Sequence, residues 1–199
     1  METGRVEAFS DGVFAIAITL LILAVGIEQS LASGSLKHSL LHLWPAYIAY
    51  AASFLTVGIM WVNHHQIFRH FVRVDRVLLL LNILLLMCIS FTPFPTRVVA
   101  DHAQNASDRT AAAVLYGSTM TVTAICFFGV WYYGSRRLLR SDTDMREVSG
   151  ITRSYLPGAP TYAFATVIAF VSSIASLVLF SAIAVFYAIS SSFFGREPS

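Results

Sequence analysis

The sequence predicts an all-α, polytopic membrane protein with six transmembrane helices in each subunit. Its mean hydropathy is +0.69, and only 12% of its 199 residues are charged, whereas about a quarter is usual in soluble domains. The apolar residues also gather in blocks close to the ~20 residues that a helix needs to cross a hydrocarbon core about 30 Å thick. We therefore expect the chain to fold in a cell membrane.

Four of these blocks each predict one transmembrane helix. In the first, acidic Glu2, Glu7 and Asp11 precede an apolar run that is too long for a secretory signal peptide, so we expect this helix to remain in the folded protein. The other three are predominantly apolar over a similar length. The four predicted spans cover residues 7–26, 43–62, 77–98 and 111–133.

The last apolar block runs from Pro160 to Phe194 without a charge. It is too long for one helix at ~1.5 Å per residue and short for two, so we divide it near Ser172 and Ser173. The two resulting spans are residues 160–174 and 176–194. The polar connecting segments are too short for a soluble domain, so residues 1–199 form one membrane domain.

Lysine and arginine predict that both termini lie in the cytoplasm. With that orientation, ten of the 13 basic residues lie on the cytoplasmic side. Because both termini then lie on the same side of the membrane, the number of spans must be even. The layout is typical of a bacterial inner-membrane protein. The ten are Arg5, Arg69, Arg73, Arg76, Arg136, Arg137, Arg140, Arg146, Arg153 and Arg196, and the other three are Lys37, Arg97 and Arg109.

Several classes of function are disfavoured by the composition and the motifs. A net charge of +2 without a long basic block gives no surface for nucleic acid. We expect no enzyme and no organic cofactor, because the chain has no serine-hydrolase elbow, phosphate-binding glycine loop or pair of intramembrane aspartates. Cys88 and Cys126 lie inside apolar blocks, where a thiol behaves as a small hydrophobe.

Polar residues gather at the end of the second predicted span, in Asn63, His64 and His65. Adjacent histidines point about 100° apart on a helix, and the zinc-protease motif is absent, so we expect no metal site. Imidazole and amide groups at this depth can instead donate hydrogen bonds to a buried carboxylate. Asp11, at the start of the first span, is the candidate acceptor.

The first span carries an apolar stripe and a carboxylate on different faces. At about 100° per residue, Asp11 lies about 140° from the middle of the stripe. The stripe faces either lipid or a pore, and the periodicity leaves both open. Its members are Phe9, Gly12, Val13, Ile16, Thr19, Leu20, Leu23 and Ile27.

The first two spans resemble the transmembrane protein 175 family of potassium channels. The resemblance rests on Arg5-x-x-x-Phe9-Ser10-Asp11 at the start of the first span, followed by Ile16, Thr19 and Leu23. It extends to Trp61-x-Asn63-His64 at the end of the second span. Beyond these spans, the resemblance lies mainly in hydropathy and topology.

The resemblance implies a homotetramer in which four first helices surround a central pore. The residues at the positions of the family's hydrophobic filter are Ile16, Leu20 and Leu23, with Ile16 innermost, and Thr19 matches a hydroxyl layer. A narrow apolar ring forces a cation to shed water, which costs potassium less than sodium. This reading predicts a potassium-selective, leak-type cation channel without a carbonyl filter, with potassium as the permeant ion and no cofactor.

The polar tip of the first span is then a structural motif formed by Arg5, Phe9, Ser10 and Asp11. We expect Asp11 to pair with Arg5 or with Asn63, His64 or His65 of the second span. Removing one partner should be worse than removing both, because an unpaired buried charge then remains. The motif partners on the second span are Trp61, Asn63, His64 and His65.

Two other functions stay open. A small proton-coupled secondary transporter could use Asp11 and a histidine as a proton relay, although no repeat relates residues 1–100 to residues 101–199. A non-conducting membrane scaffold is the third reading. Dependence of potassium flux on a proton gradient distinguishes the transporter from the channel.

Overall fold

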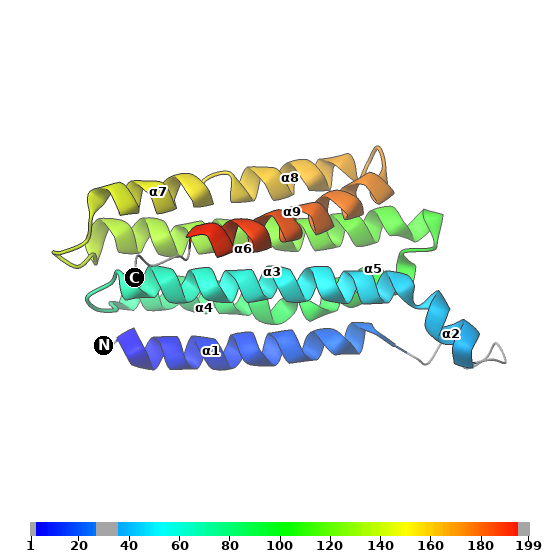
Figure 1. Ribbon diagram of the computed structural model, residues 1–199, viewed down its shortest axis with the longest axis horizontal. Coiled ribbons are helices and arrows are strands. Elements are labelled where there is room, and N and C mark those ends of the chain that lie inside the picture. Colours follow the sequence, from blue (N-terminus) through cyan, green and yellow to red (C-terminus); the bar gives the residue numbers. More distant parts are fainter. Residues whose placement is uncertain (1–2, 27–35, 195–199) are drawn as a thin grey trace.

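The structure is a computed structural model that describes residues 3–26 and 36–194. Within these ranges every regular element is helical, apart from one isolated bridge between Phe71 and Leu139, so the prediction of an all-α fold is confirmed (Figure 1). The elements are α1 (Thr3–Leu20), the 3₁₀ turn η1 (Leu21–Ala24), α2 (Leu36–His42), α3 (Trp44–Arg69), α4 (Arg76–Phe91), α5 (Pro93–His102), α6 (Ala106–Arg137), α7 (Met145–Tyr155), α8 (Gly158–Ile168) and α9 (Ser173–Phe194).

Four helical segments of the described residues are long and apolar enough to cross a membrane. They are Thr3–Ala24, Trp44–Arg69, Arg76–His102 and Ala106–Arg137, which contain the first four predicted spans except for a few end residues. The third segment consists of α4 and α5, which meet at Thr92. Proline removes an amide donor and clashes with the preceding turn, so Pro93 and Pro95 interrupt the regular hydrogen bonds there.

The last part of the chain differs from the predicted spans. The helix α8 begins at Gly158 and ends at Ile168, before the predicted end at residue 174, and α9 begins at Ser173. The turn between them lies beside the predicted division. The amphipathic helix α7 occupies a segment predicted as a connector and precedes α8 along α6 (Figure 1). Six membrane crossings therefore stay a prediction.

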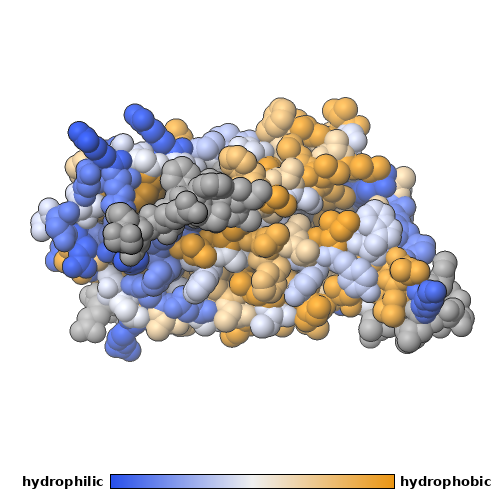
Figure 2. Space-filling model, viewed as in Figure 1, coloured by the Kyte–Doolittle hydropathy of each residue, from blue (hydrophilic) through white to orange (hydrophobic). Residues whose placement is uncertain are grey.

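The long helices run alongside one another, with hydrophobic residues over the middle of the visible face and hydrophilic residues towards its ends (Figures 1 and 2). Two glycines let α6 approach its neighbours closely. A Cβ at Gly117 would meet the Thr166 hydroxyl and the Phe180 ring, and one at Gly134 would meet the Phe71 ring. The described core thus depends on small residues at helix contacts, as is usual between membrane helices.

One end of the bundle brings together the start of α1, the end of α3, the start of α4 and the end of α6 (Figure 1). These segments carry Arg5, Arg69, Arg76, Arg136 and Arg137. This clustering agrees with the loops predicted to be cytoplasmic, while the orientation of the chain in a membrane stays a prediction. We call this the arginine-rich end.

Candidate functional site

The helix α1 lies at the edge of the bundle and buries only one face. Its buried residues Val6, Ser10, Phe14 and Ala17 recur at helical spacing, and Leu21 continues the row into η1. This face packs against α3 and α4 (Figure 1). The burial fixes the rotation of α1 about its own axis, so it also decides which side chains face outward.

The outward face carries the predicted filter residues of the apolar stripe, whereas the last stripe residue, Ile27, lies outside the described residues. Ile16 is 62% exposed, Leu23 59% and Leu20 41%, and Thr19 is exposed between them. The Thr19 hydroxyl donates a hydrogen bond to the Ile16 carbonyl oxygen over 2.8 Å. Because the hydroxyl proton is used within the helix, the lone pairs of the hydroxyl oxygen remain available to an outside donor or cation.

Three buried polar side chains join α1 to α3 and α4, and we call them the Ser10 cluster. Asn82 of α4 donates from Nδ2 to the Ser10 hydroxyl oxygen over 3.0 Å, and its Oδ1 lies 2.8 Å from Nε2 of His64. Since an amide oxygen only accepts, Nε2 of His64 is the donor. Ser10 in turn donates to the Val6 carbonyl oxygen over 2.8 Å. The cluster is satisfied internally at full burial.

Two aromatic rings enclose the histidine of the cluster. The ring of His64 stacks on Phe68 with centroids 4.4 Å apart, and Phe14 of α1 lies 5.4 Å away. The His64 imidazole thus lies between aromatic rings and bonds the side chain of Asn82. This arrangement orients α1 through both polar and apolar contacts.

Asp11 pairs with Trp61, which is one of the predicted motif partners but is not one of the residues expected to bond the carboxylate. Its Oδ1 accepts a hydrogen bond from Nε1 of Trp61 over 2.8 Å, so the carboxylate is held by the second span but not by Asn63, His64 or His65. The reason is geometric, since His64 faces the interior and bonds Asn82, whereas Trp61 lies one turn earlier on the α3 surface beside Asp11.

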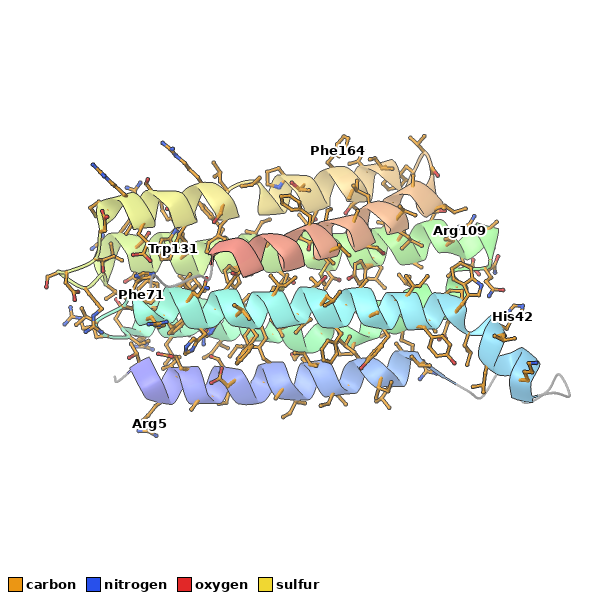
Figure 3. All side chains as sticks on the ribbon, in the orientation of Figure 1. Arg5, His42, Phe71, Arg109, Trp131 and Phe164 are labelled. Atoms are coloured by element: carbon orange, nitrogen blue, oxygen red, sulfur yellow. The ribbon has the colours of Figure 1, made fainter. Side chains whose placement is uncertain are left out.

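The remaining motif residues lie apart from this pair. The Arg5 side chain points away from the bundle (Figure 3), and the Phe9 ring is exposed. His65 Nδ1 lies 3.6 Å from Oε2 of Glu7, which gives a second polar contact between α3 and α1. Asn63 is half-buried and lines a cavity of about 70 Å³ on another side of α3.

Sequence reasoning missed Asn82 and Arg97 as residues of this site. Asn82 is an amide inside the apolar run of α4, and an isolated polar residue in a membrane span was the signal that could have revealed it. Arg97 had been counted only as a topology signal. Its Nη1 donates to the Leu23 carbonyl oxygen over 3.1 Å at the far end of α1.

Other candidate sites on the described residues lie away from α1. A larger apolar cavity of about 860 Å³ opens between α3, α5, α6 and α9. The thiols of Cys88 and Cys126 are 4.0 Å apart, within hydrogen-bonding distance for sulfur, and form no disulfide. Within residues 3–26 and 36–194, no three His, Cys, Asp or Glu side chains gather in a way that could hold a metal ion.

Fold and site together define a polytopic helical membrane protein whose first helix presents an uncharged face outward. The chain belongs to the TMEM175 family, as the sequence resemblance predicted. Residues 5–93 match the family model described as "Endosomal/lysosomal potassium channel TMEM175". A protein of Streptomyces collinus named as a potassium channel is 40% identical over 188 residues, which cover 94% of this chain and 91% of the relative.

A solved structure and a vertebrate relative agree with this assignment. The crystal structure of a lysosomal potassium-selective channel TMEM175 homolog from Chamaesiphon minutus superposes with a TM-score of 0.85 at 39% identity, covering 95% of this chain and 97% of that one. A Gallus gallus protein named endosomal/lysosomal proton channel TMEM175 is 36% identical over 137 residues, which cover 64% of this chain and 27% of the relative. All three are named as channels, so the prediction that the chain is not an enzyme is confirmed.

Proposed function

We propose that this chain is a potassium-selective, leak-type cation channel that assembles as a homotetramer around four copies of α1. The observation that carries the proposal is the outward stripe of Ile16, Leu20 and Leu23 on a helix whose opposite face is anchored in the bundle. This stripe is uncharged and is not covered by the rest of the subunit, so it is suited to line the symmetry axis of a tetramer. The bacterial relative named as a potassium channel, which matches over nearly its whole length, supports the same reading.

Ion selection arises from partial dehydration in this proposal. Four copies of Ile16, Leu20 and Leu23 form successive apolar rings without a charge, so an ion must shed water to pass. Potassium holds its water less tightly than sodium and loses less on entry, and a slightly narrower ring dewets and closes the pore. The Thr19 oxygen, whose proton is used by the Ile16 carbonyl, offers the ion a partial substitute for water.

The polar contacts of α1 act as a scaffold for these rings. The Ser10 cluster and the bond from Trp61 to Asp11 hold one end of α1 against α3 and α4. Asp11 faces α3, so its charge is kept away from the stripe. A scaffold of this kind sets the rotation of α1 that turns Ile16 toward the axis.

Flux measurements on the reconstituted protein test the proposal. Purified protein in liposomes should pass potassium down its own gradient, and Ile16→Asn should change that flux because a polar ring no longer dewets. Ile83→Asn is the matched control, since Ile83 is a similarly exposed isoleucine on α4. The absence of potassium flux above empty vesicles, or equal effects of the two substitutions, would overturn the proposal.

Proton passage is the second candidate, because the vertebrate relative is named a proton channel. His64 is a buried titratable group beside α1, since the centre of its imidazole lies 5.4 Å from that of the Phe14 ring. The same liposomes, loaded with a pH indicator, distinguish the candidates. A potassium channel passes potassium without a proton gradient, and a proton channel changes the indicator signal when a pH gradient is applied. A proton-coupled transporter moves potassium only when such a gradient is present. We place the proposed channel in a bacterial inner membrane.

A further inference from the structure

Arg97 is a charged side chain that contacts α1 at the end remote from the Ser10 cluster. It lies on α5, and its Nη1 donates to the carbonyl oxygen of Leu23 over 3.1 Å. Its Nε donates to Oδ2 of Asp101, one turn further along α5, over 3.4 Å. The guanidinium therefore links the backbone beneath one layer of the apolar stripe to the segment formed by α4 and α5.

Among residues 3–26, no backbone amide bonds this carbonyl. The 3₁₀ turn η1 ends at Ala24, and the amide of Val25 bonds the Ile22 carbonyl, so the Leu23 carbonyl is among the last oxygens of the helix and points beyond its end. A cation is also favoured at this negative end of the helix dipole. Gly26 lies beside the guanidinium, because a Cβ at that position would be in van der Waals contact with Nη2 of Arg97 at 3.4 Å, and a larger side chain would crowd it.

We propose that Arg97 is a positioning residue of the pore, which fixes the Leu23 layer and thereby the preference for potassium over sodium. This inference rests on the proposed function. The Leu23 side chain belongs to the exposed stripe while its carbonyl oxygen is tied to α5, so outward movement of the layer must break the bond. A layer that is free to widen strips less water from the ion and discriminates less between the two cations.

The charge of Arg97 acts separately from its hydrogen bond. Four guanidinium groups near one end of the pore repel cations, and the carboxylate of Asp101 offsets them. Both side chains are partly exposed, so water and salt weaken this effect. The charge therefore bears on conductance, whereas the bond to Leu23 bears on selectivity, and substitutions can separate the two.

Reversal potentials in planar bilayers, with potassium on one side and sodium on the other, test the inference. Arg97→Gln should lower the potassium-to-sodium permeability ratio about threefold or more, as expected for loss of one charge-assisted hydrogen bond, and should raise conductance. Arg97→Lys should lower the ratio with less change in conductance. Asp101→Asn should lower conductance and leave the ratio unchanged.

Arg109→Gln is the matched control for these variants. Arg109 lies near the same end of the bundle, but it donates to the Ser173 hydroxyl oxygen and to the Ala103 carbonyl oxygen, which belong to neither α1 nor η1. We expect this variant to keep the wild-type permeability ratio. Size-exclusion chromatography of each variant reports whether the assembly itself is intact.

A wild-type permeability ratio in both Arg97 variants would overturn the inference. If Arg97→Gln fails to assemble, Arg97→Lys and Gly26→Val decide, because a branched side chain at Gly26 would occupy the space of the guanidinium. Loss of assembly in all three would make Arg97 a folding residue and would also overturn the inference. Absence of potassium flux through the wild-type protein would overturn the proposed function itself. A channel whose flux changes with Ile16→Asn but whose permeability ratio is unchanged by the Arg97 substitutions would overturn this inference alone.

Discussion

Asn82 connects three helices through one side chain, because its amide nitrogen bonds Ser10 of α1 and its amide oxygen bonds His64 of α3. Asn82→Ala should lower the free energy of unfolding by about 1–3 kcal/mol for each buried group left without a partner. Thermal unfolding in detergent measures the loss. Asn63→Ala is the control, because Asn63 is half-buried beside a small cavity outside the Ser10 cluster. Equal melting temperatures of the Asn82→Ala and Asn63→Ala variants would contradict the anchoring role of Asn82.

The contact between Asp11 and Trp61 gives a second prediction for single residues. Trp61→Phe keeps an aromatic ring but removes the donor to the carboxylate, and Asp11→Ala removes the acceptor. We expect Asp11→Ala to reduce the tetramer fraction in size-exclusion chromatography, and the double variant to retain more tetramer than Trp61→Phe alone, since an unpaired partly buried charge is the costlier state. A normal tetramer with normal conductance in Asp11→Ala would contradict the scaffold role.

At the same scale, the sequence predicted the contact between α1 and α3 more readily than the pair of residues that forms it. The carboxylate beside an apolar run and the polar end of the second span both identified the contact between α1 and α3. The partner of Asp11 depends on the rotation of α3, which turns His64 inward and Trp61 toward α1. That rotation follows from packing over the whole helix, which hydropathy does not report.

Among the elements, α6 shows how closely the described helices pack. Gly117→Ala would place a Cβ against the Thr166 hydroxyl and the Phe180 ring. The hydroxyl donates to the Tyr162 carbonyl oxygen, and the buried ring packs against the Tyr162 ring. Overpacking of this kind costs about 1–3 kcal/mol, so the melting temperature should fall. Gly129→Ala on the same helix is the control, because nothing lies within 4 Å of the added Cβ. An equal response of the two variants would contradict the contact of α6 with α8 and α9.

The helices themselves were predictable to different degrees. Long apolar runs identify α1, α3, α4 and α6, because a membrane helix needs an apolar surface over its full length. The amphipathic helix α7 was missed, since its alternation of polar and apolar residues gives no apolar block. Pro157 and Pro160, at the boundary between α7 and α8, were the available signal for a new helix there.

In the whole molecule, the face of α1 that carries Ile16 is uncovered within one subunit, although the other face is held by α3 and α4. Burial of the outward face therefore requires lipid, another subunit or the lining of a pore. The family assignment favours a pore, whereas the periodicity of the helix alone left both lipid and pore open. In the proposed tetramer, four subunits would supply each apolar ring, which would let a short chain without a carbonyl filter select an ion.

An experimental structure of the assembly in lipid nanodiscs tests this claim most directly, because it identifies the side chains on the axis. We predict four subunits with Ile16, Leu20 and Leu23 of α1 facing a common axis, and with Trp61 and Asn82 directed away from it. A different helix on the axis, or an assembly in which the outward face of α1 meets only lipid, would contradict the account.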